Sequence, residues 1–271
     1  MFFKKKIRFT NAIDGIVESY PLIQASKLNR SWLRKPTEQF KKDYKDLKSG
    51  CPFTGFRPNN IAKCPGIKSL FDTGYILTCP YDFRVVTNGD GNTVDLNLPF
   101  QHSELGFAPL ATHKEEVLHK HCPAPHNTLK SILKVDGGWQ VTAPDDVVFW
   151  MTNLHYTEEQ RFSSVTGILD PKHSTKVISQ LYWHVLDGTE IIKAGTPLTH
   201  LIPMKRGFNP EFECDLPNEN DIHNKTQIAF LNSIKNQTYQ NYELIITEFY
   251  EKNLNSELSK LKVKFRLVKS K

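Results

Sequence analysis

The chain lacks a run of about 18 consecutive apolar residues, the shortest stretch that is typical of a membrane-spanning helix. We therefore expect no transmembrane segment and no membrane partner. The first residues, MFFKKKIRFTNAIDG, have no apolar stretch behind their lysines, so no secretory signal peptide is expected. The five cysteines are few and odd in number. Without a signal peptide, this count predicts reduced thiols in an intracellular protein.

Several signatures of well-known chemistry are also missing. The sequence has no C-x-x-C zinc knuckle and no glycine-rich phosphate loop. Ser163-Ser164 is not part of a G-x-S-x-G nucleophile elbow. The net charge of +6, with a pI of about 8.9, is mild for a protein dedicated to nucleic acid. These absences argue against P-loop enzymes, serine hydrolases of the elbow type and dedicated nucleic-acid binders.

What the chain does have is a long series of short β-type segments. Its 39% hydrophobic and 24% charged residues are typical of a folded globular protein. NGDGN at 88–92 is a strong hairpin turn between strands expected at 82–87 and 93–98. Further segments follow, with turns expected at Asp136-Gly137-Gly138 and Asp187-Gly188: TLKSILKV, WQVTA, DVVFWMTN, RFSSVTGIL, TKVISQLYWHVL, TEIIKAG and PLTHLIPMK. The pattern predicts a mainly β fold, either a barrel or a sandwich.

Helical patterns lie toward both ends of the chain. Residues 21–48 are polar and helix-prone, with Pro36 and Thr37 able to open a second helix, and 64–74 predicts a short helix that Gly74 ends. From about residue 218, apolar residues recur at helical spacing: Ile228, Leu231, Ile234, then Tyr242, Ile245 and Phe249. The tail that follows, KLKVKFRLVKSK, suggests a lysine-rich edge strand.

These patterns divide the chain into three parts. We expect an N-terminal helical and loop segment at 1–62, packed on a β-rich core domain at 63–207. A C-terminal helical extension with a basic tail is expected at 208–271.

The stretch HKHCPAPH gathers the most reactive side chains of the sequence. His119, His121, Cys122 and His126 are candidate ligands for zinc or iron, because imidazole and thiolate suit both metals. The usual zinc spacings are absent, and Pro123 stiffens the stretch. A solvated polar loop is therefore the simpler interpretation. Cys122 beside His121 also suggests a thiolate with its base, although adjacent side chains in an extended segment point opposite ways.

Other polar and aromatic groups have plain structural interpretations. Cys64 and Cys79 stand beside apolar residues and are expected to be small buried side chains rather than metal ligands. Asp145-Asp146, between two expected strands, predicts a turn. Lys205-Arg206 is a candidate contact for phosphate or for a partner. A set of aromatics within strands is expected in the core or on the strand surface: Trp139, Phe149, Trp150, Tyr182 and Trp183.

Six fragments, in order, carry a resemblance to a known family. They are P-x-x-x-A-x-K-x-x-x-x-W (21–32), K-C-P-G-I (63–67), G-Y-I-L with P-Y-D-F (74–83), W-Q-V-T-A-P (139–144), G-I-L-D (167–170) and K-A-G-T-P-L with I-P-M-K-R (193–206). Over roughly residues 20–207 the chain resembles a family of uncharacterised proteins from tailed bacteriophages, notably large marine myophages. It resembles a bacterial family of unknown function more distantly. The residues after Trp139 depart from the Thr-Pro-x-Gly-Tyr-Ser pattern of the phage family.

The resemblance implies a β-rich phage protein and brings no established catalytic residues. G-I-L-D followed by K-A-G-T-P-L-T-H-L-I-P is also similar to the end of dUTPase and dCTP-deaminase barrels, although their serine-rich phosphate loop is not found here. That similarity implies a dUTPase-like form of the fold.

Together these observations predict a phage accessory or virion-associated protein that acts through binding. The partner would be a protein or the assembling virion, and the location the host cytoplasm or the virion. The first alternative is a metal-dependent or nucleotide-related enzyme that uses the His119–His126 region. The second alternative is a nucleic-acid-binding module.

Overall fold

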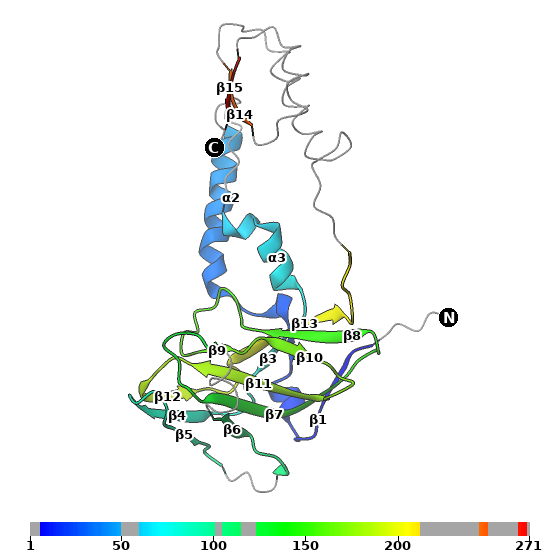
Figure 1. Ribbon diagram of the computed structural model, residues 1–271, viewed down its shortest axis with the longest axis vertical. Coiled ribbons are helices and arrows are strands. Elements are labelled where there is room, and N and C mark those ends of the chain that lie inside the picture. Colours follow the sequence, from blue (N-terminus) through cyan, green and yellow to red (C-terminus); the bar gives the residue numbers. More distant parts are fainter. Residues whose placement is uncertain are drawn as a thin grey trace, which may run out of the picture. The chain divides into compact units, whose positions relative to one another are not determined.

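β-strands dominate the computed structural model (Figure 1), which describes residues 6–49, 60–100, 105–114, 123–211, 244–248 and 265–269. The chain divides into two compact units, Met1–Phe208 and Asn209–Lys271. The strands within the described ranges form four sheets, three of them in the first unit. No helix in these ranges is long and apolar enough to cross a bilayer.

The first sheet, sheet A, is built around one long strand and is antiparallel throughout. Its order is β1-β7-β11-β9, and β6 also pairs with β7. The strands are β1 (Arg8–Asn11), β6 (Leu110–His113), β7 (Ile132–Thr142), β9 (Phe162–Ser164) and β11 (Lys176–Trp183).

Sheet B has the order β10-β8-β13-β3-β2 and is also antiparallel. Its strands are β2 (Ile23–Gln24), β3 (Tyr75–Thr78), β8 (Val147–Thr152), β10 (Gly167–Leu169) and β13 (Pro197–Lys205). Sheet C has the order β12-β4-β5, with β4 (Phe83–Asn88), β5 (Val94–Asn97) and β12 (Asp187–Ile192). The predicted NGDGN turn joins β4 to β5, and its antiparallel hairpin is confirmed.

The inner face of sheet A forms a core with both other sheets. One cluster joins Trp139 and Val177 of sheet A to Phe149 and Leu201 of sheet B. A second joins strands of sheet A to those of sheet C: Leu133, Val135, Leu181 and Trp183 with Phe83, Val85 and Ile192. Face-to-face burial of this kind is the arrangement of a sandwich. The strand order of each sheet is open-ended, so the described strands do not close into the barrel that was the other expectation.

A chain of buried hydroxyls also crosses between sheets A and B. Thr199 Oγ1 of β13 lies 2.8 Å from Ser164 Oγ of β9 and 2.7 Å from Ser179 Oγ of β11. Ser164 Oγ donates to the carbonyl of Leu198 at 2.5 Å. Each buried hydroxyl thus has a partner, which removes the cost of taking it out of water.

Asp136-Gly137-Gly138 is not the predicted turn, because β7 runs straight through it. The register with β11 shifts between Lys176 and Ile178 at this point, which marks a β-bulge. Gly138 has φ +75° and its amide donates to the Asp136 carboxylate at 2.9 Å. The residues that predicted a turn therefore form a β-bulge within the strand. Asp187-Gly188 likewise begins β12 instead of separating strands.

The helices of the first unit are short except for one. They are α1 (Ile16–Ser19), the 3₁₀ turns η1 (Ala25–Lys27), η2 (Ser31–Leu33) and η3 (Ile61–Lys63), α2 (Arg34–Ser49) and α3 (Pro65–Asp72). The prediction for 64–74 is confirmed, with Pro65 at the start of α3 and Gly74 at φ +84° beyond its end. The prediction for 21–48 is correct only from Arg34 onward, because the residues before it form β2 and two 3₁₀ turns.

In the second unit, described by itself, β14 (Leu244–Glu248) pairs in parallel with β15 (Phe265–Lys269). The expected tail strand is confirmed at β15. The helical prediction through Tyr242, Ile245 and Phe249 is wrong over Leu244–Glu248. Successive β-branched residues, Ile245, Ile246 and Thr247, favour a strand there. The helix expected at Ile228, Leu231 and Ile234 lies outside the described residues.

Candidate functional site

A cavity of about 190 Å³ lies on the face of sheet B that points away from sheet A. Ile76 and His200 line it, and they alternate along their strands with Leu77 and Leu201 of the core. The other walls come from residues 28–32, the end of α3 and the loop after β8, residues 154–158. We call this cavity the aromatic pocket.

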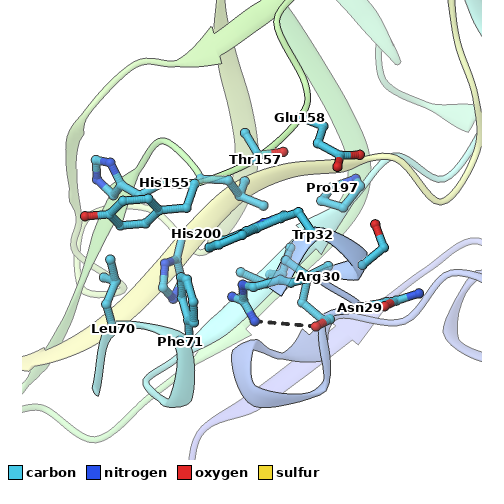
Figure 2. Close-up of a pocket in the computed structure, with 15 residues that line it drawn as sticks. Asn29, Arg30, Trp32, Leu70, Phe71, His155, Thr157, Glu158, Pro197 and His200 are labelled. Atoms are coloured by element: carbon cyan, nitrogen blue, oxygen red, sulfur yellow. Dashed lines mark hydrogen bonds between the residues drawn. The ribbon is translucent and has the colours of Figure 1, made fainter. Parts of the chain in front are cut away.

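Three aromatic rings from these three segments contact one another. The ring centroids of Trp32 and Phe71 are 6.2 Å apart, and those of Phe71 and Tyr156 are 5.9 Å apart, both pairs edge to face. Trp32 and Tyr156 lie 6.3 Å apart. Figure 2 shows Trp32 across the middle of the pocket, between Thr157 and Phe71. The arrangement matches the geometry that aromatic quadrupoles prefer, so the rings stabilise one another as well as the cavity wall.

Tyr156 is held in an unusual backbone conformation. Its φ is +58°, in the left-handed region, yet its side chain is 48% exposed. A non-glycine residue in this conformation costs about 1–2 kcal/mol. The loop after β8 therefore accepts strain and still presents a large ring at the surface.

The Arg30 guanidinium lies 4.0 Å from the centre of the Phe71 ring, in a cation–π arrangement. Its Nη1 donates to the carbonyl of Ala25 at 2.9 Å and, more weakly, to that of Leu28 at 3.4 Å. Burial lowers the pKa of Arg30, and the charge of Asp72 opposes this shift. Arg30 is thus a partly desolvated cation with a fixed orientation (Figure 2).

His200, on the floor of the pocket, is only 3% exposed. Its Nε2 lies 2.6 Å from the carbonyl of Thr73, so this nitrogen carries the proton and donates. Burial lowers the pKa of His200, the hydrogen bond to Thr73 raises it, and the charges of Arg30 and His155 lower it further. His200 is therefore neutral at pH 7, and Arg30 supplies the permanent positive charge of the lining.

Of the four residues predicted as metal ligands, the structure describes one. His119, His121 and Cys122 lie outside the described residues, and His126 is exposed. Among the described residues, no group of three or more His, Cys, Asp or Glu side chains is placed to hold a metal ion.

Two of the earlier cysteine predictions differ in outcome. Cys79 is buried as expected, and burial raises the pKa of its thiol to about 12, so it is an inert core residue. Cys64 is exposed, because it precedes α3 instead of packing in a strand.

Lys205 and Arg206, the predicted phosphate contacts, have different surroundings. Lys205 is exposed at the end of β13. Arg206 forms a two-pronged ion pair with Asp170, with Nη2 at 2.5 Å from Oδ1, and its Nε donates to the carbonyl of Asp145 at 2.7 Å. Its guanidinium therefore joins the predicted Asp145-Asp146 turn, which is confirmed, to the turn after β10.

A serine and a histidine meet on the outer face of sheet A. His184 Nε2 lies 2.9 Å from Ser163 Oγ, and burial lowers the pKa of this histidine, although a hydrogen bond to the Asn127 backbone opposes the shift. A serine–histidine contact is the first requirement of a nucleophile with its base. Neither residue lines the aromatic pocket or a second, more open cavity of about 300 Å³ beside Arg84 and Ile191.

Most of the aromatic pocket was not predicted from the sequence. Trp32 belonged to a quoted fragment, but Arg30, Phe71, Tyr156 and His200 carried no local signal. The one available clue was the concentration of histidine, tyrosine and acidic residues in the loop HYTEEQ, 155–160. Loops that rigid strands hold in place often carry binding residues.

Comparison with known proteins adds little to this geometry. No family model matches the chain, and no curated protein matches it. Among solved structures, the chain is similar to a native dUTPase of EIAV, with 16% sequence identity and a TM-score of 0.29. The match covers 56% of this chain and 88% of the dUTPase.

Proposed function

We propose that the protein acts by binding, and that the aromatic pocket receives one ring-bearing group of its partner. The observation that carries this proposal is the contact of three aromatic rings around an open cavity, one of them the exposed Tyr156. Aromatic side chains around a pocket are characteristic of the sites where partners place their anchoring residues.

The size of the pocket indicates a single small group. An apolar cavity of about 150 Å³ is large enough for benzene, whereas sites for drug-sized molecules span about 300–1,000 Å³. At about 190 Å³, the aromatic pocket accommodates one ring and a short substituent. A protein side chain or a comparable small molecule fits this description, and a whole nucleotide does not.

The strained conformation of Tyr156 supports the same proposal. Strain of this kind persists only where the surrounding structure imposes it, and it is concentrated at functional sites. A loop without a binding role would relieve the strain by placing glycine or asparagine at this position. Holding a tyrosine there instead keeps its ring beside Trp32.

The sequence resemblance provides the biological setting of the proposal. Three of the six fragments contribute to the pocket, through Trp32, Ile76 and Pro197. We propose a phage accessory or virion-associated protein whose partner is another protein of the particle or of the host. A metal-dependent or nucleotide-related enzyme, a dUTPase-like form of the fold and a nucleic-acid-binding module remain predictions from the sequence.

Ligand-observed NMR with indole and p-cresol tests the proposal directly. We expect both compounds to bind the native protein in the millimolar range and to lose binding in Trp32→Ala. The matched control is Trp150→Ala, which removes a tryptophan that is 37% exposed on β8 and outside the pocket. Equal binding by the two variants, or no binding by the folded native protein, would contradict the proposal.

A further inference from the structure

We infer that the ring received by the aromatic pocket carries a carboxylate, and that Arg30 is the partner of that carboxylate. This inference rests on the proposed binding function and specifies its ligand. It depends on the position of Arg30, on the charges around it and on the size of the cavity.

Arg30 is oriented before any ligand arrives. A guanidinium has five N–H donors, and its two Nη1 hydrogens are directed to the carbonyls of Ala25 and Leu28. The stacking on Phe71 fixes the plane of the group. The Nε and Nη2 donors have no acceptor among the described residues. Two such donors form the fork that binds a carboxylate through two parallel hydrogen bonds.

The charge of Arg30 is not neutralised by a close carboxylate. No described carboxylate forms an ion pair with it, and Asp72 acts on it only through its longer-range field. A partly desolvated charge is costly unless it is paired. A ligand anion would supply this missing partner, and the lowered pKa of Arg30 is consistent with its absence.

The surrounding charges favour a monoanion over other ligands. Arg30 is the one permanent cation of the lining, and Glu158 at the rim is exposed. A phosphate monoester carries about −1.5 to −2 charges at pH 7, so a single arginine would leave it under-neutralised beside Glu158. A quaternary ammonium group would meet the positive charge of Arg30, which already occupies one face of Phe71.

The experiment compares three probes on the full-length protein by NMR titration at pH 7. Phenylacetate has the ring and the charge, phenylacetamide has the ring without the charge, and acetate has the charge without the ring. We expect phenylacetate to bind at least about tenfold more tightly than phenylacetamide, as befits a charge-assisted hydrogen bond. Acetate alone should bind at least about tenfold more weakly than phenylacetate.

Variants at position 30 assign this preference to the guanidinium. Arg30→Gln should remove the preference, so that phenylacetate and phenylacetamide bind this variant with equal affinity. Arg30→Lys keeps the charge without the fork and should retain part of the preference. The comparison of the two isosteric probes on the native protein needs no variant, so a folding defect in either substitution leaves the inference testable.

The outcomes separate the inference from the proposed function. Equal affinity for phenylacetate and phenylacetamide would overturn the inference and leave the proposed function standing. Binding of none of the ring compounds would overturn both.

A tripeptide that ends in phenylalanine with a free carboxyl group then identifies the source of the ligand. If it binds at least as tightly as phenylacetate, the ligand is the C-terminus of a protein. If it is excluded while phenylacetate binds, the ligand is a free aromatic acid. Either result supports a ring with a carboxylate.

Discussion

At the scale of single residues, His200 shows how a polar group is kept in an apolar environment. Its ring projects from β13 of sheet B and is buried at the floor of the pocket, where one hydrogen bond to Thr73 satisfies Nε2. Burial is the largest influence on its pKa, which is lowered, and the positive charge of Arg30 acts in the same direction. Protonation of His200 is therefore coupled to unfolding.

The coupling predicts a loss of stability in mild acid. Above the ordinary pKa of histidine, near 6.5, both the folded and the unfolded chain hold a neutral His200. Below it, the unfolded chain takes up a proton that the folded chain does not, so the free energy of unfolding falls as the pH falls. One proton contributes at most about 1.4 kcal/mol per pH unit. Urea unfolding between pH 7 and 5 measures this slope.

His200→Gln should make the slope shallower, because its amide still donates to Thr73 and does not titrate. The matched control is His126→Gln, at an exposed position, which should leave the slope of the native protein unchanged. An identical slope in the native protein and in His200→Gln would contradict the argument.

At the scale of elements, the junction between α3 and β3 positions two walls of the pocket. Gly74 has φ +84°, and a Cβ atom there would lie 2.2 Å from the carbonyl oxygen of Leu201 on β13. The backbone of β13 can approach this closely only because the residue has no side chain. Phe71 and Ile76, on either side of the junction, depend on this approach for their places in the pocket.

Gly74→Ala should therefore be severely destabilising. We expect a loss of at least about 3 kcal/mol, more than the 1–2 kcal/mol that the left-handed conformation alone costs. Gly91→Ala is the control, because Gly91 has φ +72° and nothing lies within 4 Å of its added Cβ. Thermal unfolding of the two variants separates the clash from the conformational cost. Equal losses in the free energy of unfolding would exclude the clash.

Regular elements were predictable from the sequence because their signals are local. The alternation of buried and partly exposed residues along β11 follows KVISQLYW, and NGDGN specifies its hairpin. The aromatic pocket was not predictable, because Trp32, Phe71 and Tyr156 come from separate segments that only the folded chain brings together. The bulge at Gly138 was mistaken for a turn because a turn and a bulge use the same residues, and pairing with β11 decides between them.

At the scale of the whole molecule, the first unit, Met1–Phe208, has a large buried core of its own. Its three hydrophobic clusters and the aromatic pocket all lie within Met1–Phe208. A chain of this length is long enough to bury a stable core by itself. We therefore expect the first unit to fold by itself.

Residues 1–208 expressed alone should fold cooperatively. We expect one thermal transition and the same Trp32-dependent binding of indole as in the full chain. Circular dichroism and ligand-observed NMR make the two measurements. A fragment without a cooperative transition would show that the second unit contributes to the stability of the first.

The left-handed conformation of Tyr156 separates the stability of the fold from its proposed binding function at one position. Replacing this tyrosine with glycine relieves about 1–2 kcal/mol of left-handed strain. It also removes ring contacts with Trp32 and Phe71 that are worth about 0.5–1.5 kcal/mol each, so the free energy of unfolding should change little. The same replacement removes one of the three rings of the aromatic pocket. A library selected for thermostability alone would therefore tolerate this replacement and lose the proposed binding site.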